Sequence, residues 1–139
     1  DVGVSNYEPE HLETALDTDP DIIANQIEVH PLLPQSDLRE YCGDVGLDVV
    51  AYAPLASGAV FETPELQQIA DESGASVAQV SLAWLREKGV TAIPKATSEA
   101  HVLDNFASLG VDLDDEDVEK IDAIDPVERE VDPGFAPWN

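Results

Sequence analysis

The feature that most constrains the fold is a repeated alternation of short β-prone runs with helical patterns. The β-prone runs are 2–4, 22–29, 47–52 and 90–93, and an amphipathic helical pattern follows each of them. These four strand–helix units repeat in architecture rather than in sequence. Such alternation is typical of an α/β fold, so we expect strands and helices to alternate along one domain.

The last of these units, residues 89–105, carries the most chemical information. Its β-prone run ends at a proline, Lys95 follows at the strand exit, and Thr97 and Ser98 offer an N-cap to a helix. The apolar positions of that helix are Val102, Phe106 and Leu109. Free N–H groups, the positive end of the helix dipole and a lysine together suit a phosphate. In parallel α/β barrels, phosphate sites recur after the seventh and eighth strands.

Four short motifs follow one another along the chain in a fitting order. They are Gly3-Val4-Ser5-Asn6, Asn25-Gln26-Ile27-Glu28-Val29-His30-Pro31, Ala51-Tyr52-Ala53-Pro54-Leu55, and Ile93-Pro94-Lys95 with Asn105 ten residues beyond the lysine. Each motif alone is weak, but together and at these spacings they resemble the aldo-keto reductases over nearly the whole chain. The resemblance implies that residues 1–139 are the cofactor-binding, C-terminal half of a (β/α)8 TIM barrel, strands five to eight.

The resemblance also implies an activity, the NADP(H)-dependent reduction of an aldehyde or ketone to an alcohol by hydride transfer. The cofactor carries that chemistry, and the protein holds it. By resemblance, Ser5, Asn6 and Gln26 hold the nicotinamide carboxamide, and Tyr52 stacks on the nicotinamide ring. From the residues alone, a tyrosine that packs the barrel rim is the simpler interpretation of Tyr52. The following loop lies over the pyrophosphate in the family and adds Leu55 and Ser57 to the implied site.

At the other end of the implied cofactor, Lys95 meets the 2′-phosphate and Thr97 donates beside it. Asn105 holds the adenine, with Asp104 near the adenosine end. Two positions depart from the family pattern: an alanine at position 96 replaces a usual serine, and His101 replaces a usual arginine. Both departures remove groups that favour a 2′-phosphate, so NADP is the expected cofactor and NAD remains an alternative.

The family's catalytic tyrosine, lysine, aspartate and histidine come from strands that precede Val2. We therefore expect no catalytic residue in this chain, and Tyr7, Tyr41 and Tyr52 do not match the catalytic tyrosine. The expected partners are a small carbonyl substrate and the N-terminal half of the same barrel. Two alternatives are a non-catalytic relative that binds nicotinamide cofactor, and a half-barrel that assembles with itself. No zinc-binding spacing, G-x-G-x-x-G or P-loop is present, and no metal is expected.

Acidic residues dominate the composition, with 30 Asp and Glu against six Lys and Arg and a formal net charge of −24. Such a surface repels nucleic acid and anionic membranes, so neither is expected as a partner. With 43% hydrophobic residues and clear periodicity, the charge indicates adaptation to molar salt rather than disorder. One cysteine and no long apolar run favour a cytoplasmic location. The absence of methionine and the start at Asp1 lead us to expect a piece of a longer chain.

Several local expectations concern polar residues and helix ends. Asn25, Gln26 and Glu28 interrupt an apolar strand and need partners if they are buried, whereas His30 is expected to be structural. The expected N-caps are Ser36, Ser76 and Asp114, with a capping box at Ser76, and a further helix is expected over residues 64–73. The aromatic tail at 132–138 either fastens against the barrel or walls the substrate pocket, as the family's C-terminal loop usually does.

Overall fold

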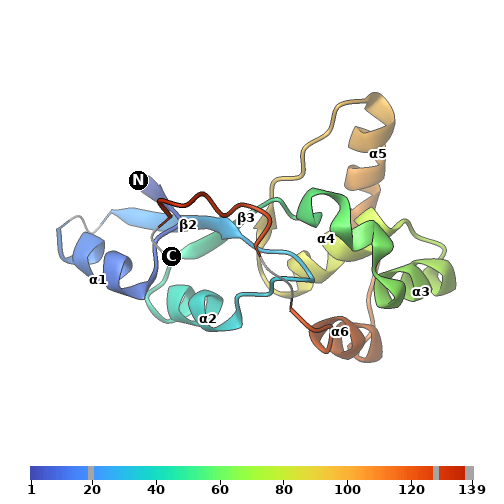
Figure 1. Ribbon diagram of the computed structural model, residues 1–139, viewed down its shortest axis with the longest axis horizontal. Helices are drawn as coiled ribbons and strands as arrows, with labels where there is room; N and C mark the ends of the chain where they lie inside the picture. Colours follow the sequence, from blue (N-terminus) through green and yellow to red (C-terminus); the bar gives the residue numbers. More distant parts are fainter. Residues whose placement is uncertain (19–20, 127–128, 137–139) are drawn as a thin grey trace.

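The computed structural model describes residues 1–18, 21–126 and 129–136. Its sheet has four parallel strands in the order β1-β2-β3-β4 (Figure 1). The strands are β1 (Val2–Ser5), β2 (Ile22–Glu28), β3 (Asp48–Tyr52) and β4 (Thr91–Ala92). The α-helices are α1 (Pro9–Thr18), α2 (Ser36–Asp44), α3 (Pro64–Ser73), α4 (Val77–Glu87), α5 (Glu99–Ala107) and α6 (Asp115–Asp122), with 3-10 helices η1 (Ala56–Glu62) and η2 (Ser108–Gly110). The expected α/β architecture with its parallel sheet is confirmed.

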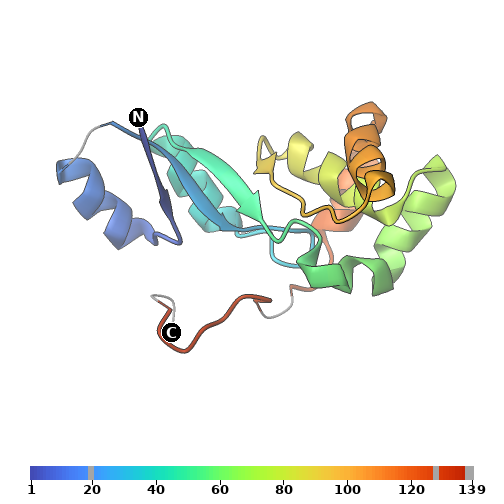
Figure 2. The same cartoon turned by 90° about the horizontal axis from the view of Figure 1, so that it is seen from above.

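Helices cover one side of the sheet, and the end of the chain passes along its rim. Helices α1 and α2 lie together below the sheet in Figure 1, and α3, α4 and α6 pack beyond β3. The view from above shows residues 129–136 running past the carboxyl end of β1 (Figure 2). Consecutive parallel strands place all their carboxyl ends at one edge, which is where α/β proteins build sites.

The core is centred on α4, whose residues Ala78 and Val80–Leu85 are buried. Trp84 is fully buried, and its indole N–H donates to Asp122 at 2.9 Å, which ties α4 to α6. The charged ends of Arg39 and Lys88 lie 6.0 and 5.7 Å from the Trp84 ring, so two cations flank the largest core side chain.

Most of the expected helix ends are confirmed because they are specified locally. Ser76 and Gln79 form the predicted capping box, Asp114 caps α6, and Ser98 caps α5 by accepting from the His101 N–H at 3.2 Å. Helix α3 covers the predicted residues 64–73, and a glycine in the left-handed region follows it. One cap was predicted wrongly, and it lies at the start of α2.

Ser36 is the first residue of α2 rather than its N-cap. Gln35 occupies the cap position with φ 46°, and its side chain makes no capping hydrogen bond. Instead the Gln35 amide donates to the Glu28 carbonyl at 2.7 Å, a contact across the end of β2. That tertiary hydrogen bond accompanies a left-handed conformation at Gln35, and the helix starts one residue earlier than the local pattern indicates.

The last strand and the helix after it are the least supported elements. Strand β4 is two residues long, shorter than the predicted 90–93, and it pairs with β3 alone. The predicted apolar positions Val102, Phe106 and Leu109 are 55%, 70% and 62% exposed, and the last of them lies in η2, beyond the end of α5. Helix α5 itself contains no buried residue. It stands away from the rest of the molecule in Figure 1. Its apolar positions are therefore uncovered within the described part of the chain.

Candidate functional site

Strand register brings four of the predicted site residues to one place on the rim of the sheet. Ser5 at the end of β1 pairs with Gln26 of β2, and two residues further along β2 Glu28 pairs with Tyr52 at the end of β3. Asn6 follows β1 directly, and its N–H donates to the Gln26 carbonyl at 2.9 Å. The polar side chains predicted from three separate motifs thus lie together.

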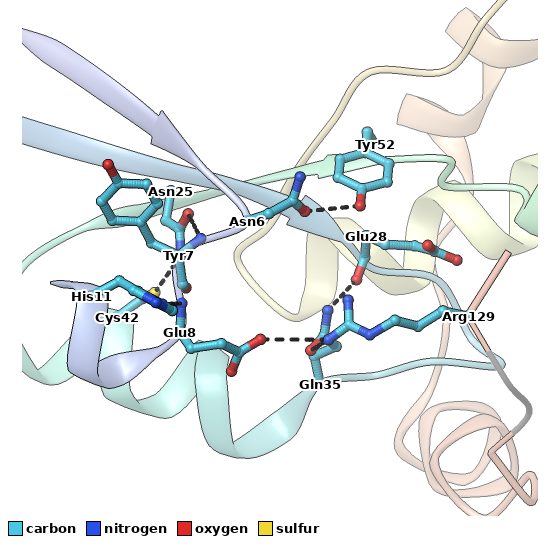
Figure 3. Close-up of polar contacts among 10 residues, drawn as sticks. All are labelled: Asn6, Tyr7, Glu8, His11, Asn25, Glu28, Gln35, Cys42, Tyr52 and Arg129. Atoms are coloured by element: carbon cyan, nitrogen blue, oxygen red, sulfur yellow. Dashed lines mark hydrogen bonds and ion pairs between the residues drawn. The ribbon is translucent and has the colours of Figure 1, made fainter. Parts of the chain in front are cut away.

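Hydrogen bonds link this cluster across the three strands. The Tyr52 hydroxyl donates to Asn6 Oδ1 at 2.8 Å (Figure 3). Asn6 Nδ2 donates to Ser5 Oγ at 3.3 Å. Ser5 Oγ donates to the Gln26 carbonyl at 3.0 Å. The side-chain amide of Gln26 has no hydrogen-bond partner among the described residues. Burial and the nearby negative charge of Glu28 raise the pKa of Tyr52, which keeps its hydroxyl a donor.

Backbone strain gathers in the segments that follow β1 and β3. Asn6, Ala53, Ala56 and Ser57 have φ values of 59°, 46°, 47° and 49°. A non-glycine residue in this region costs on the order of 1–3 kcal/mol, and such residues cluster at functional sites. Leu55, predicted to lie over the cofactor, is half-buried between two of the strained residues. The strained loop and the polar cluster occupy the same rim.

A second group of predicted residues surrounds the N-terminus of α5. Lys95 follows β4 and is exposed, as are Thr97 and His101. The chain's six Lys and Arg residues all lie within the described ranges, and Lys95 alone among them has no partner there. The other five are engaged by carbonyl or carboxylate groups: Arg39 by Pro34, Arg86 by Ser108 and Val111, Lys88 by Asp122, Lys120 by Glu116, and Arg129 by Glu8.

Two further predicted residues have clear structural surroundings. The Asp104 carboxylate accepts hydrogen bonds from the Ser76 hydroxyl at 2.8 Å and the Gln79 amide at 2.6 Å, so it braces the N-terminus of α4. Asn105 lines a groove of about 420 Å³ between α4 and α5, together with Phe106. The cofactor contacts assigned to both residues stay predictions.

Sequence reasoning missed the residues that attach the end of the chain to this rim. The buried Glu28 carboxylate accepts the N–H groups of Glu130 at 2.7 Å and Val131 at 3.0 Å, and it contacts His30 Nε2 at 3.0 Å. Arg129 donates to Gln35 at 3.0 Å. The polar Glu28 inside an apolar strand indicated that hydrogen-bond partners were needed. It did not indicate which distant segment of the chain supplies them.

A cavity of about 720 Å³ lies along β1 and α1 and reaches the end of the chain. Ser5 and Asn6 line it together with α1, and Pro133 and Phe135 also contribute to its wall. Phe135 thus belongs to a pocket wall, whereas Trp138 of the predicted aromatic tail lies outside the described residues. Groups of three or more His, Cys, Asp or Glu placed to hold a metal ion are absent from the described residues. Within the same ranges, no helix is long and apolar enough to cross a membrane.

A parallel α/β sheet with polar groups and a lysine at the carboxyl ends of its strands is the arrangement of barrel enzymes that bind phosphate-bearing ligands. Residues 1–126 match the model of the aldo/keto reductase family, and the chain belongs to that family.

Individual relatives agree with this assignment in sequence and in structure. The chain is 40% identical to the glyoxal reductase of Bacillus subtilis over 129 residues, which cover 92% of this chain and 47% of that protein. It is 37% identical to aldose reductase C of Dictyostelium discoideum, over 88% of this chain and 39% of the relative.

Solved structures give the same result. The aldose reductase of Giardia lamblia superposes with a TM-score of 0.85 at 31% identity, over 91% of this chain and 46% of that structure. A silkworm (Bombyx mori) aldo-keto reductase in complex with NADPH also gives a TM-score of 0.85, at 34% identity over 94% and 44% of the two chains. The chain thus spans about half the length of the relatives it matches.

Proposed function

We propose that this chain supplies the NADP(H)-binding half of an aldo-keto reductase, strands five to eight of a (β/α)8 barrel, which reduces an aldehyde or ketone to an alcohol. The observation that carries the proposal is the Ser5, Asn6, Gln26 and Tyr52 cluster, gathered from three strands by their register. When bound, the nicotinamide cofactor supplies the hydride.

The cluster fits a nicotinamide carboxamide, which needs both donors and acceptors. Ser5 and Asn6 provide hydroxyl and amide groups. The Gln26 amide, which has no partner among the described residues, provides an NH2 donor group and a carbonyl acceptor. The Tyr52 ring, held by its bond to Asn6, provides a flat face for the pyridine ring. Leu55 and Ser57 extend the site along the strained loop toward the pyrophosphate.

The exposed Lys95 at the N-terminus of α5 supports NADP as the cofactor. A lysine without a protein partner among the described residues is available to a 2′-phosphate, and the α5 N-terminus adds the positive end of its dipole. Thr97, His101, Asp104 and Asn105 complete the adenosine side of the proposed site. The silkworm relative crystallised with NADPH supports the same choice.

The proton that completes the alcohol has to come from outside this chain in this proposal. Among its tyrosines, Tyr7, Tyr41 and Tyr52 do not match the family's catalytic acid. General acid catalysis is worth roughly 10²–10⁴ in rate, so the N-terminal half of the barrel is required as a partner. The uncovered apolar face of α5 and the one-sided pairing of β1 and β4 support such a partner. We place the enzyme in the cytoplasm, where a thiol such as that of Cys42 stays reduced.

Cofactor binding tests the site directly. In the full-length protein, Tyr52→Ala removes the stacking ring and is expected to weaken NADPH binding by roughly 5- to 150-fold, because stacking on an aromatic ring is worth about 1–3 kcal/mol. Tyr52→Phe is the matched control, because it keeps the ring and loses only the hydroxyl bonded to Asn6. Equal dissociation constants for Tyr52→Ala and wild type, measured by fluorescence titration, would argue against stacking.

Activity and assembly measurements distinguish the alternatives. We expect no steady NADPH oxidation with an aldehyde by the 139-residue chain alone, and turnover when the upstream half-barrel is present. Cofactor binding without turnover in the full-length protein would favour a non-catalytic relative. A stable dimer of the 139-residue chain in sedimentation would favour self-assembly, because a second copy would then cover the open edges.

A further inference from the structure

We propose that Glu28 is a positioning residue that holds the chain at residues 129–131. This attachment, which we call the clasp, places Phe135 at the cavity beside Ser5 and Asn6. The clasp itself is a property of the fold, and only its effect on the substrate rests on the function proposed above. Three sets of contacts support it, one at the carboxylate, one around Arg129 and one at the cavity.

The Glu28 carboxylate is fully buried, and the end of the chain supplies most of its partners. Oε1 accepts the Glu130 N–H at 2.7 Å and lies 3.0 Å from His30 Nε2, and Oε2 accepts the Val131 N–H at 3.0 Å. A buried carboxylate without hydrogen bonds is costly. If the segment leaves, Oε2 loses its partner among the described residues, so the buried charge favours the docked segment.

A second set of contacts holds the same segment from the other side. Arg129 donates to Gln35 Oε1 at 3.0 Å, and Gln35 in turn donates to the Glu28 carbonyl at 2.7 Å (Figure 3). Arg129 also lies 3.6 Å from the Glu8 carboxylate, just before α1. The clasp therefore joins the final segment to the starts of α1 and α2 and to the end of β2.

Anchoring at residues 129–131 determines where the last described residues lie. The Ala136 N–H donates to the Pro133 carbonyl at 2.8 Å, which closes a turn that begins two residues beyond the anchor. That turn presents Phe135 to the cavity, although the Phe135 side chain is 90% exposed. A side chain with so little packing of its own takes its position from the backbone anchor.

Hydrogen exchange at single amides tests the clasp in the full-length protein, without cofactor or substrate. Glu28→Gln keeps the size of the side chain, but its amide offers one acceptor oxygen in place of two. The amides of Glu130 and Val131 are expected to exchange roughly ten- to hundredfold faster, while the amides of β2 and β3 keep their protection. Glu62→Gln makes the same charge change at an exposed residue and is expected to change neither.

The effect on a substrate is read from steady-state kinetics with an aromatic aldehyde. Glu28→Gln and Phe135→Ala are each expected to raise KM roughly two- to tenfold, the range for one aromatic contact, with kcat and NADPH binding unchanged. The double variant is expected to show no further rise, because both changes remove the same contact. Phe135→Ala is also expected to leave the exchange of the two anchoring amides unchanged.

Unchanged exchange at Glu130 and Val131 in Glu28→Gln would overturn the clasp. If that variant does not fold, the wild-type protein is measured alone, and exchange of these two amides as fast as in an unfolded peptide would likewise overturn the clasp. A KM that rises as much in the double variant as the product of the two single effects would overturn the placement of Phe135. If these two amides exchange faster in Glu28→Gln but the wild-type protein reduces no carbonyl compound, the clasp is supported and only the proposed function is contradicted.

Discussion

Lys95 differs from the other cations of this chain because the described structure leaves it free to meet a ligand. In a protein with 30 acidic and six basic residues, an unpaired lysine beside a helix N-terminus is a poor candidate for a stabilising role. Its neighbour in the first turn of α5 is His101, where the family pattern has arginine, so we propose that Lys95 carries the larger part of any preference for a 2′-phosphate.

Replacing Lys95 tests that preference. Lys95→Met is expected to weaken NADPH binding by roughly ten- to a hundredfold, because a hydrogen bond to a charged group contributes about 1.5–3 kcal/mol. NADH binding is expected to stay the same, since NADH lacks the 2′-phosphate. The measurement is the ratio of the two dissociation constants at fixed high salt.

Two further variants make that result specific. Lys120→Met removes the same charge from α6, where Lys120 is paired with Glu116, and the ratio is expected not to move. His101→Arg adds a permanent charge and is expected to shift the ratio toward NADPH. Equal loss of NADPH and NADH binding in Lys95→Met would mean that the lysine does not face the 2′-phosphate.

His30 is a second residue with a measurable consequence, through pH. Burial lowers the pKa of His30 from its ordinary value of 6.5, and this outweighs the hydrogen bond and charge of Glu28 and the charge of Glu130. Above pH 6.5 the imidazole is neutral in both the folded and unfolded states. Below it the unfolded state binds the proton first, so the free energy of unfolding falls as the pH falls.

Below pH 6.5, His30 is expected to contribute to the slope of the free energy of unfolding against pH. His30→Gln is expected to make that slope shallower by up to one proton, about 1.4 kcal/mol per pH unit. Urea unfolding of both proteins at several pH values between about 5 and 7.5, in fixed molar salt, gives the two slopes. Parallel curves would show that His30 does not contribute this linkage.

The same residues show what sequence reasoning reaches and what it does not. Glu28 was correctly expected to need partners if it was buried. His30, just beyond β2, is buried and contacts Glu28, and its structural role stays a prediction. The partners of Glu28 at residues 130 and 131 were not predicted, because no local pattern links positions about a hundred residues apart. The hydrogen bond between Tyr52 and Asn6 likewise depends on strand register, which only the assembled sheet determines.

Among the helices, α4 combines a local N-cap with a tertiary brace. Ser76 and Gln79 form the capping box, and Asp104 of α5 accepts a hydrogen bond from each of them. Caps of this kind were predicted from sequence at Ser76 and Asp114 because the pattern is contained within four residues. The exposure of α5 and the start of α2 were not, because both depend on what lies beside the helix rather than within it.

Ser76→Ala is therefore expected to cost more than an ordinary cap. Loss of the cap contributes about 1 kcal/mol, and the Asp104 carboxylate also loses a donor, so the total is roughly 1.5–2.5 kcal/mol. Ser36→Ala is the matched control, since Ser36 makes no cap, and its effect is expected to stay within about 0.5 kcal/mol. Urea unfolding of the two variants gives both values, and similar losses would contradict the special role of Ser76.

At the scale of the whole molecule, the charge of −24 is the dominant property. Five of the six cations already satisfy groups of the protein, so they leave most of the acidic surface without nearby compensation. We propose that the protein is adapted to molar salt, where the Debye length is about 3 Å instead of about 30 Å at 0.01 M. Added salt then relieves repulsion that no internal contact removes.

Thermal unfolding in increasing KCl tests this adaptation. The Tm is expected to rise by roughly 10 °C or more between 0.01 M and 1 M KCl, because screening reduces self-repulsion. A variant of α1 with Glu10→Gln, Glu13→Gln and Asp17→Asn carries three fewer negative charges and is expected to show a smaller rise. A Tm that is independent of salt, or the same rise in both proteins, would contradict the proposal.

The parallel register between β1, β2 and β3 also determines where this family member can change in length during evolution. Successive side chains of a strand point to opposite faces, so deleting one residue of β2 would turn over its alternation and carry Gln26 and Glu28 away from Ser5 and Tyr52. Residues 111–113 belong to no strand, and an insertion there would leave that alignment in place. Length variation among homologues is therefore expected to concentrate in such connections, whereas the strands keep their length.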